Sequence, residues 1–192
     1  METKNASFAW QTIEEEKGPQ WFAMRVLYRG EEAMSADLMS AGMETFLPLH
    51  VVEKKVGGRR KRVMAPVISN LLFVRAEKQQ LQTFKAAPGR ERLQYICHHG
   101  GAMDKKPIVV PDEQMTAFIR IYEEGQHELT TELADLQPGT RVRVIEGPFT
   151  GLVGTFRRVK GHRARRFVVL LDGLAAISMQ MEPSCLELLK EE

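Results

Sequence analysis

The first half of the chain alternates between strand-like and helix-like patterns of apolar residues. Residues 21–26 place apolar side chains at every second position, which predicts a strand with one apolar face. Residues 34–41 carry them at helical spacing, and Gly42 follows as the residue that ends the helix. Pro48 disfavours helix in the residue before it, so the chain is expected to be extended there.

Five further elements are expected between residues 51 and 122. A charged run with Gly57-Gly58 at its centre predicts a hairpin or mobile loop over 51–62, and the apolar run 67–74 predicts a buried strand. The others are a short helix around Leu81 and Phe84, a strand over 93–97 and a helix that starts at Pro111. Together these elements predict an α+β domain, with a mainly antiparallel sheet flanked by helices.

The rest of the chain, residues 136–192, shows no helical spacing. Its apolar or alternating segments are separated by turn residues and are 141–144, 152–156, 167–171, 175–181 and 186–188. Five short strands in so few residues predict a small all-β barrel.

Composition fits an ordinary soluble protein, with 43% hydrophobic and 27% charged residues in a chain of 192. The longest apolar run, 167–171, is far shorter than the roughly 20 residues of a membrane span. Residues 1–19 lack the apolar core of a signal peptide and are expected to be a loosely ordered extension. Cys97 and Cys185 lie far apart, which argues against a disulfide scaffold or zinc module and favours the cytoplasm.

The small net charge of +2 hides a division of the chain into blocks of opposite sign. Residues 20–122 hold 16 bases and 10 acids, residues 123–135 hold five acids and no base, and residues 136–190 hold nine bases and four acids. This division predicts two basic domains joined by an acidic linker over 123–135. The alternative is a solvated helix that continues the preceding one.

Residues 144–154 resemble a KOW motif, which marks SH3-like barrels of transcription elongation factors and some ribosomal proteins. The residues that carry the resemblance are Gly147, Pro148, Phe149, Gly151 and Gly154. We expect positive φ angles at Gly147 and Gly151, which bracket a tight turn, and a close approach of another strand at Gly154. Phe149 is expected to fold over the barrel. A phosphate-binding loop is the alternative, but neither a helix pattern nor Gly-Lys-Ser/Thr follows.

The first block resembles the N-terminal domain of the NusG family. The matching motifs are Trp21-Phe22, Phe46-Leu47-Pro48, the basic hairpin 54–62, the strand 66–74 and the helix start 110–115. The resemblance implies a NusG-like domain over 20–122 and a KOW domain over 136–192. Ser69-Asn70-Leu71 stands where general NusG proteins usually carry Pro-Gly-Tyr, and residues 21–26, 93–95 and 108–115 look most like the specialised UpxY-type antiterminators of capsular polysaccharide operons.

The resemblance implies that the first domain binds the coiled-coil clamp helices of the largest RNA polymerase subunit, a helix-in-groove contact. The positions that match the family's anchors are Phe22, Arg25, Leu71 and Phe73. If Leu71 is an exposed anchor, Leu71→Asp abolishes polymerase binding and leaves the domain folded. The alternative is that Leu71 and Phe73 are core residues.

The hairpin is also a candidate for binding nucleic acid, because six like charges in nine residues repel one another unless a polyanion relieves them. The candidate residues are Lys54, Lys55, Arg59, Arg60, Lys61 and Arg62, with Arg29, Arg90 and Arg92 as further candidates. In a transcription complex the polyanion is non-template DNA or nascent RNA, and such contacts position a protein without reading sequence. A solvated loop is the alternative.

A second basic loop belongs to the KOW block and consists of Arg157, Arg158, Lys160, Arg163, Arg165 and Arg166. The resemblance implies that this domain recruits the Rho terminator or a small-subunit ribosomal protein, and direct RNA binding is equally compatible. One NusG paralogue refolds its KOW domain into helices, but the period-2 alternation here predicts a stable barrel.

Catalysis has little support in the sequence. Cys97-His98-His99 is the one cluster with suitable chemistry, and neighbours on an extended strand point to opposite faces. We expect no catalytic residue, metal or cofactor, no membrane contact, and a monomer that acts in transcription elongation and antitermination. The alternatives are a KOW-type RNA-binding or ribosome-associated protein without polymerase contact, and a hydrolase that uses Cys97.

Overall fold

The computed structural model describes residues 18–97, 106–125, 127–130, 139–171 and 174–189. The N-terminal extension expected over 1–19 lies outside these residues except at its end, as do His98, His99 and positions 131–135 of the expected linker. None of the helices in the described ranges is long and apolar enough to cross a membrane.

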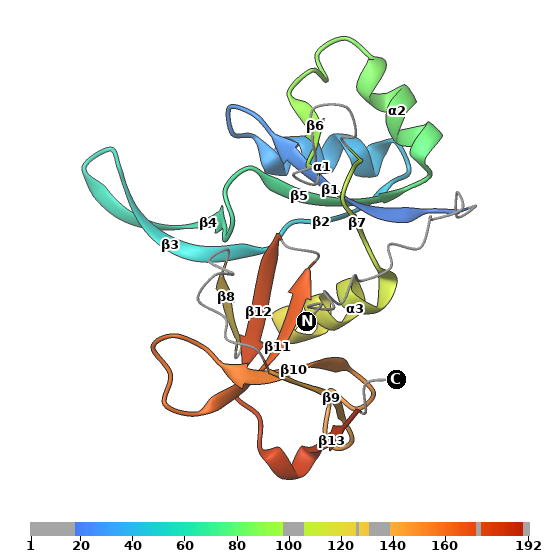
Figure 1. Ribbon diagram of the computed structural model, residues 1–192. Helices are drawn as coiled ribbons and strands as arrows, with labels where there is room; N and C mark the ends of the chain where they lie inside the picture. The colour runs from blue at the N-terminus through green and yellow to red at the C-terminus, as the bar shows by residue number, and fades with distance from the viewer. Residues whose placement is uncertain (1–17, 98–105, 126, 131–138, 172–173, 190–192) are drawn as a thin grey trace, which may run out of the picture.

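The first sheet is antiparallel and is built around β1, as Figure 1 shows. Its strands are β1(Gln20–Val26), β2(Glu44–Phe46), β5(Leu71–Ala76), β6(Leu93–Tyr95) and β7(Val109–Val110), in the order β2-β5-β1-β6 with β7 also paired to β1. The helices are α1(Glu31–Ser40), α2(Lys78–Ala86) and α3(Asp112–Glu123). The α+β domain expected from the sequence is therefore confirmed.

The two faces of the sheet carry separate apolar clusters, because neighbouring residues of a strand point to opposite sides. Phe22, Met24 and Val26 pack on one face with residues of α1 and α2. Trp21 and Ala23 lie on the other face, in a cluster that includes Phe73 and residues of α3. The alternation predicted for residues 21–26 thus produces a two-sided core.

A long hairpin projects away from this domain (Figure 1). It consists of β3(Leu49–Val56) and β4(Arg59–Pro66), which pair with each other in a separate two-stranded sheet. Gly57 and Gly58 form the turn with φ angles of 59° and 79°. Positive φ at both turn positions is what a tight two-residue hairpin turn requires, so the hairpin expected over 51–62 is confirmed.

The second sheet has six antiparallel strands in the order β13-β9-β10-β11-β12-β8. They are β8(His127–Thr130), β9(Thr140–Val144), β10(Val153–Arg158), β11(Arg165–Leu171), β12(Ala175–Met179) and β13(Leu186–Leu188), and a 3-10 turn, Pro183–Cys185, precedes the last of them. The all-β character expected of this block is observed. The sheet is open across the described residues, with β13 and β8 at its two edges, so the structure shows no closed barrel.

Two expected elements take a different form. The apolar run 67–74 was expected to form one strand, but Asn70 has a φ angle of 64°, and the strand begins only at Leu71. Within the segment expected to be a linker, Glu123 ends α3 and His127–Thr130 form β8, which pairs with β12. The sequence did not predict this strand.

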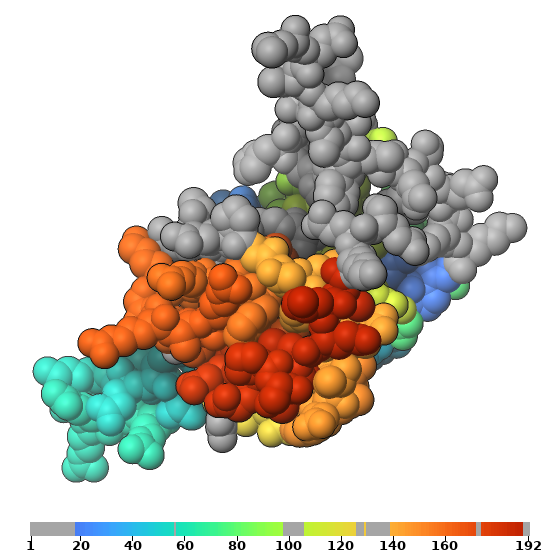
Figure 2. Space-filling view, turned by 60° about the horizontal axis from the view of Figure 1, so that its bottom comes forward, coloured from blue at the N-terminus to red at the C-terminus, as the bar shows by residue number. Residues whose placement is uncertain are grey.

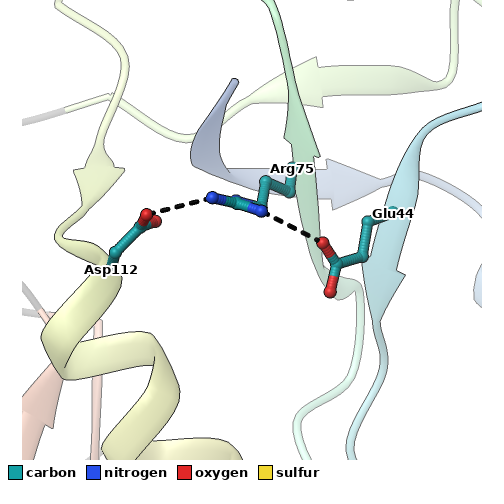
Figure 3. Close-up of polar contacts among 3 residues, drawn as sticks. All are labelled: Glu44, Arg75 and Asp112. Carbon is teal, nitrogen blue, oxygen red and sulfur yellow. Dashed lines mark hydrogen bonds and ion pairs between the residues drawn. The ribbon is translucent and has the colours of Figure 1, made fainter. Parts of the chain in front are cut away.

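Helix α3 packs against both sheets. It contacts β1 in the first sheet and both β11 and β12 in the second, and one continuous apolar cluster joins residues from the two sheets. At its N-terminal end, Asp112 accepts a hydrogen bond from Arg75, whose guanidinium also lies 3.6 Å from Glu44 on β2 (Figure 3). Nearer its C-terminal end, Arg120 donates to the main-chain oxygen of Pro148.

Candidate nucleic-acid interface

The basic hairpin places like charges directly opposite each other. Lys54 pairs with Lys61 in the strand register, and Lys55 pairs with Arg60. All four side chains are exposed. Like charges opposite each other on a sheet destabilise it, so these rungs weaken the hairpin unless an anion binds there.

The two faces of the hairpin differ in how far their charges are balanced. Directly opposed residues share a face, so one face carries Lys54, Arg59 and Lys61 and no acid. The other face carries Lys55, Arg60 and Arg62 with Glu53, whose carboxylate lies 3.7 Å from the Arg60 guanidinium. The first face is therefore the stronger site for a polyanion.

The second basic run forms a hairpin from β10, β11 and their turn, again with two rungs of like charge. Arg158 pairs with Arg165, and both side chains are exposed. Arg157 pairs with Arg166, and on this rung Arg166 is buried and Arg157 is partly buried. Burial lowers the pKa of Arg157 below the usual range of arginine, because the charged guanidinium loses water.

Arg166 corrects one expectation from the sequence. Only 8% of it is exposed, and its guanidinium donates to the hydroxyl of Ser178 at 3.1 Å and to the main-chain oxygen of Ser178 at 3.3 Å. A buried arginine held by hydrogen bonds is a structural residue. The exposed candidates of this run are Arg158, Lys160, Arg163 and Arg165.

The three remaining arginine candidates do not form a single patch. Arg90 pairs with Asp37 on α1, and its guanidinium lies over the Phe84 ring at 4.7 Å. Arg92 lies beside the turn between β1 and α1, because its Nη1 would be 3.1 Å from a Cβ added at Gly30. The structure therefore brings Arg92 to the turn that carries Arg29 and leaves Arg90 between α1 and α2.

The same turn presents an aromatic residue that the sequence analysis did not single out. Tyr28 and Arg29 have φ angles of 62° and 60°, values uncommon for residues other than glycine. The Tyr28 side chain is 91% exposed. A nucleic-acid base can stack on an exposed ring beside an arginine. The adjacent Tyr28 and Arg29 in the sequence could have indicated this candidate site.

The candidate polymerase-binding residues occupy different environments. Phe22 is 2% exposed and packs edge-on against Tyr95 in the cluster under α1 and α2. Leu71 and Phe73 are 4% and 0% exposed on the opposite face of the sheet. Arg25 is exposed and lies directly opposite Leu71 in the register.

These burials change the expectation for Leu71→Asp. A carboxylate at this site would lie within an apolar cluster, where an unpaired charge is strongly unfavourable. The substitution would therefore damage the fold as well as any contact, and Arg25 is the candidate that can be tested without disturbing the core.

The turn between β9 and β10 has the geometry expected at its glycines. Gly147 and Gly151 have φ angles of 84° and 90°, and the Thr150 hydroxyl donates to the Gly147 oxygen at 2.7 Å. A Cβ at Gly154 would lie 2.7 Å from both the Phe167 ring and the main-chain oxygen of Val168. The expected turn and close approach are therefore observed, and Phe149 is 7% exposed within the apolar cluster.

The cysteines show no catalytic arrangement in the part of the chain that the structure describes. Both Cys97 and Cys185 are free thiols. Cys97 forms an isolated bridge with Pro107, and its neighbours His98 and His99 lie outside the described residues. Across the described ranges, no three His, Cys, Asp or Glu side chains gather as a metal site.

Comparison with known families covers the first sheet and its helices. A family model described as "Transcription termination factor nusG" matches residues 19–119, more than half of the chain. The chain belongs to the NusG family. No curated protein matches it.

Membership of the NusG family fixes the broad role of the chain. NusG proteins are cytoplasmic transcription factors, not enzymes, and they typically bind RNA polymerase. The family match ends within α3 and includes β3 and β4. The basic hairpin is thus part of the NusG domain, whereas the β10–β11 hairpin lies beyond the matched residues.

Proposed function

We propose that this NusG-family protein is a specialised elongation and antitermination factor of the UpxY type. It binds the clamp helices of RNA polymerase through its N-terminal domain and promotes read-through of long operons, with capsular polysaccharide loci as the target class. A ligand that favours the closed clamp shifts polymerase out of paused states. The observation that carries the proposal is the NusG match over a domain whose observed fold agrees with it.

The margin of the sheet face that holds Leu71 and Phe73, beside the part that α3 covers, is the proposed polymerase-binding surface. Phe46 and Ile68 are partly buried at the margin of its apolar cluster, and Arg25 is exposed at its end. Helix-in-groove contacts combine a few apolar anchors with a polar rim. In this proposal the buried residues shape the surface, and the exposed Arg25 makes a rim contact.

The second block is proposed to be an SH3-like KOW domain over residues 136–192, joined to the NusG domain over 20–122 by the acidic segment 123–135, part of which pairs with the second sheet as β8. The positive φ angles of Gly147 and Gly151 and the all-antiparallel strand order support this assignment. Its proposed partners are the Rho terminator, a small-subunit ribosomal protein or nascent RNA, and the free protein is proposed to be a monomer.

Retention of RNA polymerase on the immobilised full-length protein tests the proposal. Arg25→Glu is expected to weaken the retention by about ten-fold or more, because it reverses a rim charge at the proposed contact. Arg25→Lys keeps the charge and is expected to retain polymerase. Lys78→Glu is the matched control, since it reverses an exposed charge on α2, which packs on the opposite face of the sheet.

Two results would contradict the proposal. The first is wild-type protein that retains no polymerase, and the second is Arg25→Glu protein that retains as much polymerase as Lys78→Glu. An unchanged circular dichroism melt for each variant shows that the fold is intact.

The exposed Arg158, Arg163 and Arg165 favour a second candidate function, an RNA-binding or ribosome-associated protein that does not contact polymerase. Under this alternative, the wild-type protein retains ribosomes or RNA and no polymerase. The same experiment therefore separates the two functions.

A further inference from the structure

We propose that the β3–β4 hairpin and the β10–β11 hairpin are two arms of a single nucleic-acid site that holds one phosphate backbone at two places. The inference deepens the proposed function, because it rests on the nucleic-acid contact of the basic hairpin. It does not depend on polymerase binding. The ligand chemistry is a phosphodiester backbone, which DNA and RNA both supply.

The first observation is that both arms have the same charge pattern. Each hairpin carries two successive rungs of like charge near its turn, Lys54–Lys61 and Lys55–Arg60 in one, and Arg157–Arg166 and Arg158–Arg165 in the other. Residues 155–171 contain no acid, and the first hairpin contains only Glu53. Such rungs destabilise a strand pair, and a bound polyanion relieves the repulsion.

The second observation is that the arms lie on the same side of the molecule. The β3–β4 hairpin and the turn between β10 and β11 both extend to the left in Figure 1, and both remain on that side in Figure 2 after the rotation. One extended polyanion along that side would meet both arms. The exposed cations available to it include Lys54, Arg59 and Lys61 on one arm and Arg158 and Arg165 on the other.

The third observation is that one helix touches the base of each arm. At one arm, the Tyr122 hydroxyl of α3 accepts a hydrogen bond from the Leu49 amide at 2.6 Å and donates to the Leu49 oxygen. At the other arm, α3 packs against β11. The spacing of the arms is therefore set by packed structure, which favours simultaneous binding because little freedom is lost on the second contact.

Binding of labelled DNA to the full-length protein, without polymerase, tests the inference. The probes are a duplex of about 30 base pairs, roughly 100 Å long at about 3.4 Å per base pair, a single strand of about 30 nucleotides, and a short duplex of about 8 base pairs. One variant carries Lys54→Gln and Lys61→Gln, the second carries Arg158→Gln and Arg165→Gln, and the third combines all four changes. Lys78→Glu is the control, because it changes the net charge by the same two units as each double variant.

If both arms hold one ligand, each double variant weakens binding of the long probe about ten-fold or more at low salt, while the control does not. Each pair of removed contacts also lowers the slope of log affinity against log salt by roughly 1.8 for duplex or 1.4 for single-stranded DNA. The probe that the wild-type protein binds with the higher affinity at a given salt concentration identifies the preferred form of nucleic acid. The short duplex, which is expected to engage a single arm, loses much less affinity in either double variant.

Three results would overturn the inference. If one wild-type molecule binds two long probes, and each double variant loses one of them and binds the other with unchanged affinity, the hairpins are separate sites. If the variant with Arg158→Gln and Arg165→Gln behaves like Lys78→Glu, only the β3–β4 hairpin binds. Both of these results leave the nucleic-acid contact of the proposed function in place. The third result is a wild-type protein that binds no probe, which removes both this inference and that contact.

Discussion

The two basic hairpins resemble each other in sequence and differ in their surroundings. Each carries six bases near a glycine-containing turn. The β3–β4 hairpin is a two-stranded ribbon that pairs with no other described strand, and all six of its bases are exposed. The β10–β11 hairpin continues into a six-stranded sheet, where Arg166 is buried and Arg157 is partly buried.

This difference shows that charge density alone does not identify a binding surface. A basic residue on a free ribbon remains in water on either face, whereas one within a wider sheet is buried or exposed according to its register and the side chains of the neighbouring strands. A buried arginine then needs acceptors, which Ser178 supplies to Arg166. Each hairpin therefore has six basic residues, but all six are exposed in the first hairpin and only four in the second.

The largest expected difference between the hairpins concerns their apolar residues. Phe167 is fully buried at the base of the second hairpin, and Met64 on the first is 50% exposed. Phe167→Ala is expected to lower the free energy of unfolding by about 3–5 kcal/mol, because it leaves a cavity. Met64→Ala is expected to change it by about 0.5 kcal/mol or less. Urea denaturation of both variants measures this, and equal losses would mean that the first hairpin is part of the core.

The next difference concerns the arginine that the sequence analysis assigned to the binding surface. Arg166→Met removes the donors to Ser178 and is expected to cost about 1–3 kcal/mol of stability, because a buried acceptor is left unsatisfied. Lys61→Met is its counterpart on the exposed ribbon and is expected to cost about 0.5 kcal/mol or less. Thermal denaturation distinguishes the two, and an Arg166→Met protein as stable as wild type would return Arg166 to the list of surface candidates.

The smallest expected effect comes from the like-charge rungs. Lys61→Glu places a carboxylate opposite Lys54 and is expected to stabilise the free hairpin by about 0.2–1 kcal/mol, in a manner that salt screens. Amide hydrogen exchange of residues 51–64 measures this local stability. His50→Glu also adds a carboxylate to the hairpin, at a rung opposite Ala65, and is the control, although it changes the charge by one unit where Lys61→Glu changes it by two. A slower exchange in both variants would point to the net charge of the hairpin and away from the rung.

Most of the fold follows from the apolar pattern, because the burial of alternating and helical faces is a local property of the sequence. The helices and most strands of the first domain were predicted on this basis, but β7 was not. The turn at Gly57-Gly58 was predicted from its glycines, and the conformations of Gly147 and Gly151 from the resemblance to a KOW motif. The late start of β5 was not, because it depends on a distant residue. Glu31 accepts a hydrogen bond from the Asn70 amide at 2.8 Å and supports the turn there.

Strand β8 and the burial of Leu71 could not be predicted either, because both depend on distant parts of the chain. His127–Thr130 contain one apolar residue among polar neighbours, and they form a strand because β12 offers a free edge with which to pair. Likewise, no periodicity separates Leu71 as a core residue from Leu71 as a surface anchor, since the presence of α3 over that face is a tertiary feature. Burial by a distant element is the information that the sequence pattern lacks.

The place of α3 has a consequence for the length of ligand that the protein accepts. Two domains on a flexible tether accommodate footprints of many lengths, whereas two arms braced by one helix accept a footprint close to a single value. A change in the length or tilt of α3 would alter that value without touching any charged residue. The length of the helix would then set the length of nucleic acid that is bound, and relatives with a longer or shorter helix at this position would bind a different length.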